Sequence, residues 1–282
     1  MPTKTPLLWA TLALHLLCLT HHSLTATSLS GNPLIGAINL FSSLLFSFTH
    51  HTHASSSIAL PTLLLVMQAV GWGLTTYMDV VLQRGWFFGV HAFGDALAEH
   101  AVLGVPMGVL IGMYPVMYAS TGVTNLLLLP GKRTSRKASR VITALASAAI
   151  DTLIFTAYDL CIDPLGPADG MWKWDRSAFV HGAYFGVPVK NYYGWLIVNF
   201  PTFFVVRLLG GVGRARGGWV FEAAPVVAYA MNAVWLCRIA PFEELRLVTV
   251  GVMGVPVVVA LANLVLARWE EDERIGLGKK NR

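Results

Sequence analysis

Residues 158–195 read YDLCIDPLGPADGMWKWDRSAFVHGAYFGVPVKNYYGW and begin at the end of an apolar run. Two aspartates, Asp159 and Asp163, lie where that run stops, and a segment rich in Trp, Tyr, Gly and Pro follows them. So many aromatic side chains are costly to leave in water, so we expect the segment to be folded rather than disordered. The rest of the chain shows what kind of protein contains such a segment.

The composition is that of an integral membrane protein. The chain has 282 residues, of which 55% are hydrophobic and only 12% are charged, and its mean hydropathy is +0.60. A soluble domain carries about 25% charged residues. Several apolar runs reach the roughly 20 residues that a transmembrane helix needs. We therefore predict one integral membrane domain, residues 1–282, with an all-α fold, a polytopic helical bundle.

Eight apolar runs are candidate transmembrane helices. They cover residues 6–26, 33–49, 58–83, 102–129, 141–162, 192–210, 218–239 and 246–267. The first run also has features of a signal peptide, because Lys4 precedes it, but a retained helix is the favoured interpretation. No internal repeat is evident. The polar stretch HTHASSSI, residues 51–58, is interpreted as a connector, and the cluster His50, His51 and His53 as a solvated loop rather than a metal site.

Basic residues cluster in three segments outside these runs. GKRTSRKASR (131–140) has five of them, Arg214 and Arg216 precede the seventh run, and others follow the eighth. The positive-inside rule assigns these segments and both termini to the cytoplasm, and in a eukaryotic cell we expect the membrane to be the endoplasmic reticulum. Segments 84–101 and 163–191 then fall together on the opposite side. The net charge of +5 resides in such loops and does not indicate a nucleic-acid partner.

Acidic side chains are rare within the apolar runs, where each costs about 2.5–3.5 kcal/mol to insert and is usually functional. Asp159 and Asp163 are four residues apart and share a helix face, and Asp95 and Glu99 have the same spacing. Two carboxyl groups in a dry site cannot both ionise easily, so one keeps its proton and becomes a Brønsted acid. We predict Asp159 or Asp163 as the proton donor, with Asp95 or Glu99 as a second acid or final base. The alternative is that Asp163 merely ends the helix before Pro164.

A loop rich in aromatic residues, Gly and Pro, residues 164–194, follows the two aspartates. An interfacial belt explains part of its aromatic content, but Gly186-Val187-Pro188 and Asn191 indicate a re-entrant lid over a cavity. Aromatic faces stabilise cations. An acid beside such a wall would protonate a trisubstituted alkene to a tertiary carbocation, and the substrate would be an isoprenoid chain from the bilayer.

The chain lacks the sequence motifs of several other chemistries. The chain has no Gly-rich phosphate loop, zinc spacing, Ser-His-Asp arrangement or haem motif, and its three cysteines make no metal or redox spacing. It also has no DDxxD-type motif, so ionisation of a prenyl diphosphate is not supported. We therefore expect no cofactor and no metal.

Several features in this order resemble the membrane carotenoid hydratases of the bisanhydrobacterioruberin and γ-carotene type. They are D-x-x-x-D-P, W-x-W, G-V-P-x-x-N and G-W, all within residues 159–195. The resemblance implies proton-initiated addition of water to the terminal double bond of an acyclic carotenoid. It places these residues in the site: Asp159, Asp163, Trp172, Trp174, Tyr184, Asn191 and Trp195.

The first half of the chain departs from that family. Glu99 is followed by Pro106-Met107-Gly108, and Leu110 stands where the family has a tyrosine. In overall character the chain also resembles the small integral membrane terpene cyclases of fungal meroterpenoid pathways, in which an internal alkene captures the cation. The departure slightly favours cyclisation. Hydration is the alternative, and Asn191, His181 or Tyr184 would then hold the water.

A proton-coupled transporter is the alternative from another class, because intramembrane aspartates also serve proton transport. The chain is small and shows no paired halves, which favours an enzyme. Asp151, in the middle of the fifth run, is equally well explained as an interhelical hydrogen-bond partner. The expected partners are a lipophilic isoprenoid substrate, membrane lipid and other enzymes of the same pathway.

Overall fold

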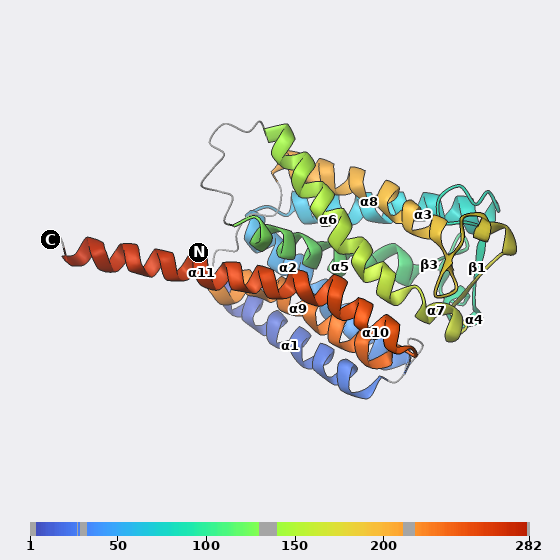
Figure 1. Cartoon of the computed structure of the whole chain (residues 1–282), viewed down its shortest axis with the longest axis horizontal. Helices are drawn as coiled ribbons and strands as arrows, with labels where there is room; N and C mark the ends of the chain where they lie inside the picture. Colours follow the sequence, from blue (N-terminus) through green and yellow to red (C-terminus); the bar gives the residue numbers. More distant parts are fainter. Residues whose placement is uncertain (1–3, 27, 29–32, 130–139, 211–217, 281–282) are drawn as a thin grey trace.

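Apolar segments in a bilayer find no water for their backbone groups, so they form helices whose hydrogen bonds are internal. The computed structural model describes residues 4–26, 28, 33–129, 140–210 and 218–280, and shows a bundle of such helices (Figure 1). The long helices are α1 (Lys4–Thr25), α2 (Pro33–Ser55), α3 (Ala59–Thr76), α5 (Met107–Leu127), α6 (Arg140–Ile162), α8 (Val189–Leu209), α9 (Trp219–Ile239) and α11 (Val255–Lys280). The predicted all-α membrane bundle is confirmed.

Each predicted span corresponds to one long helix. The eighth also includes α10 (Glu243–Thr249) and a π-helical turn, η4 (Val250–Gly254), which lead into α11. Five segments in the described part of the chain are long and apolar enough to cross a membrane: Ala59–Val81, Arg140–Ala168, Val189–Leu209, Trp219–Ile239 and Glu243–Glu271. The number of crossings, eight, therefore stays a prediction.

The second helix overturns the prediction of a polar connector. α2 continues through the histidines, and His50 and His51 are 2% and 0% exposed. The His50 ring lies 2.5 Å from the Tyr118 hydroxyl and 2.7 Å from the Phe221 carbonyl oxygen, and His51 lies 3.2 Å from the Tyr114 hydroxyl. The solvated loop was the wrong interpretation, because both rings are buried inside the bundle against tyrosines of α5, and only Nε2 of His51 lacks a hydrogen-bond partner among the ring nitrogens of this pair. Among the described residues, no group of three or more His, Cys, Asp or Glu could hold a metal.

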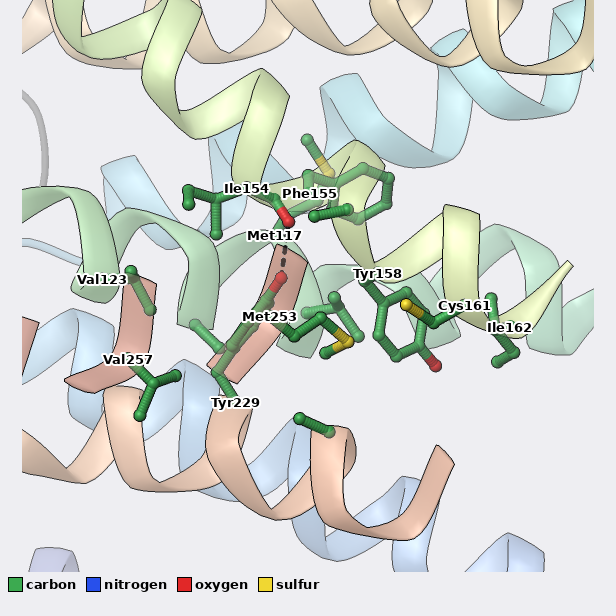
Figure 2. Close-up of a cluster of buried hydrophobic side chains, with 14 of the residues drawn as sticks. Met117, Val123, Ile154, Phe155, Tyr158, Cys161, Ile162, Tyr229, Met253 and Val257 are labelled. Atoms are coloured by element: carbon green, nitrogen blue, oxygen red, sulfur yellow. Dashed lines mark hydrogen bonds between the residues drawn. The ribbon is translucent and has the colours of Figure 1, made fainter. Parts of the chain in front are cut away.

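The hydrophobic core lies among α3, α5, α6, α8, α9 and the α10–α11 segment. Figure 2 shows its centre, where Phe155 and Tyr158 of α6 meet Met253 and Tyr229. The Tyr229 hydroxyl donates to the Ile154 carbonyl at 2.6 Å, so this buried polar atom is satisfied. The core thus fixes the position of α6, the helix that carries Asp159, relative to α9 and the α10–α11 segment.

Short strands and helices gather at one end of the bundle (Figure 1). They are β1 (His91–Phe93), α4 (Asp95–Ala98), β2 (Ala101–Val102), β3 (Val105–Pro106), α7 (Leu165–Ala168), β4 (Trp172–Trp174), the 3-10 helix η3 (Arg176–His181), β5 (Ala183–Tyr184) and β6 (Val187–Pro188). β1 pairs antiparallel with β4. This pairing confirms that segments 84–101 and 163–191 lie together, and the loop predicted as a lid is folded.

Two hairpins at this end have the same sequence pattern. Residues 101–106 read AVLGVP and residues 183–188 read AYFGVP. Ala101 pairs with Pro106, and Ala183 pairs with Pro188, so the register is the same. In both hairpins the two turn residues have positive φ, as a two-residue type I′ turn requires, and glycine is the second of them. Each hairpin leads directly into a long helix, α5 or α8.

The two hairpins belong to an internal repeat. A long helix, a strand, a short helix, a hairpin and a second long helix occur in this order twice, first over α3–α5 and then over α6–α8. β1 and β4 pair about Ala92 and Lys173, the middle residue of each strand. Antiparallel pairing centred on equivalent residues relates the two halves by a local twofold axis. The prediction that the chain has no internal repeat is therefore wrong.

The basic segments used to predict orientation are only partly described. Residues 131–139, Arg214 and Arg216 lie outside the described residues. Figure 1 shows the start of α1 and the end of α11 at the end of the bundle opposite the strands. The two terminal helices thus point their outer ends in the same direction. The side of the membrane on which they lie stays a prediction.

Candidate active site

Asp163 lies at the end of α6 and is almost completely buried. Its Oδ2 accepts hydrogen bonds from Asn191 Nδ2 at 2.5 Å and from Trp195 Nε1 at 2.9 Å. The two donors are one turn apart near the start of α8, so they project from one face of that helix. Both bonds end on Oδ2, and no described side chain or backbone group is hydrogen bonded to Oδ1.

An aromatic cluster holds Trp195 in place. The rings of Trp72 and Trp195 have centroids 3.6 Å apart, and Phe88 lies 5.0 Å from Trp195. Trp72 Nε1 donates to Asn199 Oδ1 at 3.0 Å, and Asn199 Nδ2 donates to the Trp195 carbonyl at 2.8 Å. This network ties α3 to α8 beside Asp163.

Asp79 shapes the opposite wall. It lies in a π-helical turn, η1 (Tyr77–Val81), that extends α3 and is fully buried. Its carboxylate accepts the backbone N–H groups of Trp86, Phe87 and Phe88 at 2.6, 3.0 and 2.5 Å. These bonds fold residues 86–88 back onto the helix end and bring Phe88 against Trp195. π-Helical turns are frequent at functional sites.

A cavity of about 70 Å³ lies between the two repeats. One water needs only about 10–15 Å³ of such space, so the cavity has room for a larger group. It is lined by Trp72, Thr76, Phe88, His91, Phe93, Val109, Met113, Asp163, Trp172, Trp174, Asn191 and Trp195. Most of these side chains are aromatic or aliphatic. The polar groups among them are therefore the candidates for chemistry.

The lining residues of the two repeats correspond in pairs. His91 and Phe93 occupy the outer positions of β1, as Trp172 and Trp174 do in β4. Val109 and Met113 lie as far beyond the first hairpin as Asn191 and Trp195 lie beyond the second. The first repeat thus supplies aliphatic side chains at the positions where the second supplies hydrogen-bond donors to Asp163.

Five of the predicted site residues line this cavity: Asp163, Trp172, Trp174, Asn191 and Trp195. Asp159 does not, although it lies one turn before Asp163 and is 0% exposed. Neither carboxyl oxygen of Asp159 has a hydrogen-bond partner, and the buried hydroxyls of Tyr184 and Tyr192 also lack one. Tyr192 interacts electrostatically with both aspartates. Asp159, Tyr184 and Tyr192 therefore form a cluster of buried polar groups without hydrogen-bond partners behind the cavity wall.

The other predicted acids lie elsewhere. Asp95 and Glu99 are exposed on and beside α4, and neither is among the residues that line the cavity. The structure therefore does not bring them to Asp163. His181, a predicted water-holding residue, is also exposed and outside the lining.

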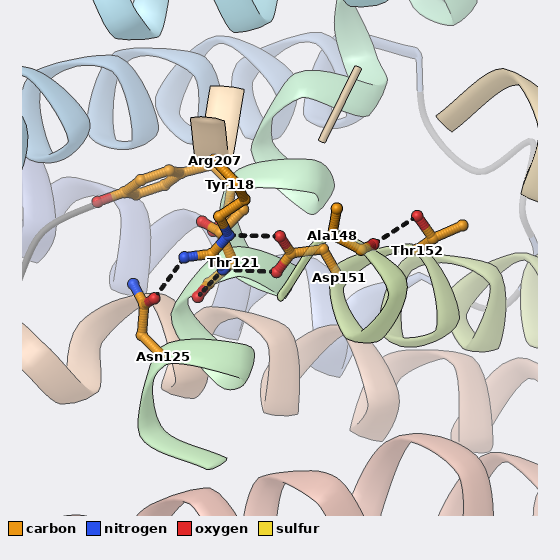
Figure 3. Close-up of polar contacts among 7 residues, drawn as sticks. All are labelled: Tyr118, Thr121, Asn125, Ala148, Asp151, Thr152 and Arg207. Carbon is orange, nitrogen blue, oxygen red and sulfur yellow. Dashed lines mark hydrogen bonds and ion pairs between the residues drawn. The ribbon is translucent and has the colours of Figure 1, made fainter. Parts of the chain in front are cut away.

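Asp151 has the structural role that was one of its two interpretations. Figure 3 shows its carboxylate facing the Arg207 guanidinium of α8, with both Arg207 Nε and Nη2 at 2.6 Å. Arg207 also donates to Asn125 Oδ1 at 2.6 Å and to the Thr121 carbonyl at 3.3 Å. This bidentate pair links α6 to α8 and, through Arg207, to α5.

Sequence reasoning missed the lining residues of the first repeat. These are Trp72, Thr76, Phe88, His91, Phe93, Val109 and Met113. The repeated AxxGVP hairpin was a signal for two of them. Aligning the two hairpins places Val109 and Met113 at the positions of Asn191 and Trp195, which were already predicted to be in the site.

The comparisons with known proteins give one curated relative and one family. A bisanhydrobacterioruberin hydratase of Haloarcula japonica is 29% identical over 139 residues, which cover 49% of this chain and 41% of that protein. The aligned part thus spans less than half the length of that relative. No solved structure matches the chain significantly. The relative supports the hydratase alternative, and nothing in the comparisons supports terpene cyclisation.

A family model extends this likeness beyond one relative. The model described as carotenoid biosynthesis protein matches residues 34–266. That range contains both repeats and every residue that lines the cavity. The match covers far more than half of the chain, which therefore belongs to the carotenoid biosynthesis protein family.

Proposed function

We propose that this protein adds water to a terminal trisubstituted alkene of an acyclic carotenoid, with Asp163 as the proton donor. The observation that carries the proposal is a buried carboxyl group that opens onto an aromatic cavity. The hydratase name of the Haloarcula relative supports the reaction class.

The hydrogen bonds of Asp163 suit a proton donor. Asn191 and Trp195 both donate to Oδ2, the oxygen that acts as the carbonyl of a neutral carboxyl group. Oδ1 then carries the proton and is free to face the alkene. The two donors also keep the carboxyl group from rotating, so the direction of proton transfer is fixed.

The reaction conserves all atoms of the alkene and one water. The Oδ1 proton passes to the CH carbon of the alkene, whose π electrons form the new C–H bond, and the neighbouring carbon becomes a tertiary cation. Water bonds to that cation and loses one proton, which gives a tertiary alcohol. The faces of Trp172, Trp174 and Trp195 stabilise the cation by about 0.5–2 kcal/mol each.

Asp159 is the group that returns a proton to Asp163. It lies one helical turn away, and its oxygens and the hydroxyls of Tyr184 and Tyr192 have no other partners in the described chain. Burial raises the pKa of the Tyr184 hydroxyl to about 12, so this hydroxyl keeps its proton at neutral pH. A protonated hydroxyl can accept one proton and pass on another.

The cavity is too small for a whole carotenoid. Its volume of about 70 Å³ suits one end of the carotenoid, so the remainder of the substrate stays in the bilayer. Every step uses side chains of this protein and water, so the proposal requires no cofactor.

The experiment compares the full chain with Asp163→Asn in proteoliposomes that contain lycopene as an acyclic probe, in water labelled with ¹⁸O. We expect the wild-type product to gain one labelled water. Asp163→Asn is expected to be slower by at least about 100-fold, the usual scale for loss of a general acid. Asp175→Asn is the matched control, because Asp175 is exposed and asparagine can replace it as the cap of η3.

Two outcomes would contradict the proposal. Full activity of Asp163→Asn would remove the acid from its role. A farnesylated phenol is supplied in a parallel reaction, and its conversion to an isomer with fewer double bonds, without hydration of lycopene, would assign cyclisation instead.

A further inference from the structure

The cavity needs a second polar site, because a tertiary cation must meet a water that is already held in place. In the second repeat, Asn191 and Trp195 are committed to Asp163. The indole N–H groups of Trp172 and Trp174 have no partner, but an indole N–H only donates and cannot take a proton from water. The first repeat contributes two polar side chains to the lining, Thr76 and His91. Both are almost completely buried, so their polar atoms have little access to bulk water.

The ring of His91 has a fixed orientation. Its Nδ1 lies 2.8 Å from the Gly89 carbonyl oxygen. A carbonyl oxygen only accepts, so Nδ1 carries the hydrogen and Nε2 of the neutral ring carries the lone pair. Phe93 packs edge-on against the ring at 5.3 Å, and Trp174 lies 6.0 Å away. No described group is hydrogen bonded to Nε2.

The environment of His91 suits a base. Burial lowers the pKa of its imidazole below the ordinary value, so the ring is neutral at pH 7 and Nε2 can accept a proton. Asp79 is the carboxylate that interacts electrostatically with His91, and it favours the imidazolium that forms. The three backbone N–H groups that bind Asp79 keep it in place.

Thr76 supplies a second contact for a water. It is the last residue of α3, is 3% exposed and lines the cavity together with His91. A held water needs two to four polar partners. The Thr76 hydroxyl and His91 Nε2 provide two of them, on the repeat opposite to the one that carries Asp163.

We infer that His91 and Thr76 hold the nucleophilic water, and that His91 Nε2 takes its proton as the oxygen bonds to the cation. This inference rests on the proposed hydration and assigns its second step. The water oxygen forms the C–O bond, one O–H bond breaks, and its electron pair stays on oxygen. His91 later releases its proton to water that enters the cavity, and Asp159 returns one proton to Asp163 and regains one from water, so the cycle balances.

Deuterium separates the two steps. In D₂O, Asp163 adds deuterium to the CH carbon of the alkene. A cation that meets no water returns a proton or deuteron from that carbon to the Asp163 carboxylate, so recovered substrate carries deuterium without becoming an alcohol. The assay measures both recovered lycopene and alcohol by mass, in proteoliposomes that contain the full chain.

The test variant is His91→Phe, which keeps an aromatic ring and removes the acceptor. Alcohol formation is expected to fall at least about 100-fold, whereas deuterium incorporation into recovered lycopene continues. Thr76→Val, which is nearly isosteric, is expected to lower alcohol formation roughly tenfold, the effect of a lost 1.4 kcal/mol hydrogen bond, and to leave exchange intact. Asp163→Asn should lose both exchange and alcohol.

The possible results distinguish the inference from the function on which it rests. Alcohol formation at the wild-type rate in His91→Phe, or in Thr76→Val should His91→Phe not fold, would overturn the role of this pair. Loss of exchange together with alcohol in folded His91→Phe would also overturn it, because His91 would then serve the first step. A wild-type protein that makes no alcohol would overturn the proposed hydration, and the water site with it.

Discussion

Asp163 and His91 belong to different repeats, and this separation allows one to donate a proton while the other accepts one. A carboxyl group in contact with an imidazole would form an ion pair, and neither a free acid nor a free base would remain. Here the hydrogen-bond partners are neutral. Asp163 is held by Asn191 and Trp195, and His91 is held by a backbone carbonyl.

The pH dependence of alcohol formation follows from His91. Burial lowers its pKa below the ordinary value of 6.5, against the smaller opposing effects of the Gly89 carbonyl and Asp79. The neutral ring is the base, so activity is expected to persist as the pH falls through 6.5 and to be lost only below it. A pH–rate profile of alcohol formation checks this, with the deuterium exchange rate as the internal control. If the rate has already fallen to half of its maximum at pH 6.5 or above as the pH is lowered, the prediction is contradicted.

Single residues show where sequence spacing informs and where it does not. Asp163, Asn191 and Trp195 were found because all three lie on one short segment. Asp95 and Glu99 share the spacing of the aspartate pair, yet they are exposed beside a four-residue helix at the end of the bundle. Spacing predicts a common face, but only packing between distant elements decides whether that face is buried.

At the scale of elements, the helix α8 is positioned by polar contacts at two depths. Near its start it holds Asp163, and near its end Arg207 holds Asp151 of α6. The side chains of Arg207 and Asp151 are 8% and 0% exposed. Two contacts on the same neighbour, at opposite ends, fix both the tilt and the rotation of α8 relative to α6.

Asp151→Asn is expected to destabilise the protein by about 3–5 kcal/mol, because it leaves the buried Arg207 without its counter-charge. Replacing both residues, as Asp151→Leu with Arg207→Leu, should cost clearly less than the sum of the two single changes. Thermal unfolding in detergent, arranged as a double-mutant cycle, measures the coupling. Costs that simply add would contradict a direct pair. Neither side chain lines the cavity, so folded protein should retain exchange activity.

The second helix shows why polarity alone misleads inside a membrane bundle. His50 and His51 read as a polar connector because a hydropathy scale scores each residue without its partners. In the folded protein, Tyr118 and Tyr114 of α5 lie against their rings. These partners are more than 60 residues away in the chain. A long-range pairing of this kind has no local signal, although the helix itself could be expected from the flanking apolar residues.

At the scale of the whole molecule, the repeat explains the chemical asymmetry of the cavity. Two copies of one arrangement meet face to face, and equivalent positions have diverged. Asn191 and Trp195 bind the acid in one copy, whereas Val109 and Met113 leave the other apolar. An alkene between them meets the acid from one repeat and water from the other. In the sequence this repeat is visible only as two copies of a six-residue AxxGVP pattern, which lie somewhat less than a third of the chain apart.

The antiparallel pair β1–β4 joins the two repeats, and a disulfide can test it directly. Ala92 and Lys173 are opposite each other and both are exposed. Directly opposed residues have Cα atoms about 4.5–5.5 Å apart, within the range of a disulfide. We expect Ala92→Cys with Lys173→Cys to form an intramolecular bond on mild oxidation, detected by mass as a linked pair of peptides. Each single variant is the control for the native cysteines, of which Cys161 is buried.

The cross-linked protein should keep its activity. Side chains alternate along a strand, so positions 92 and 173 face away from the cavity that their neighbours His91, Phe93, Trp172 and Trp174 line. If oxidation gives no linked peptides, the two repeats do not meet at these strands. If the bond forms and abolishes exchange and alcohol formation together, the repeats must separate during turnover. Retained activity with the bond in place would show that the acid and the water site work from a fixed pair of walls.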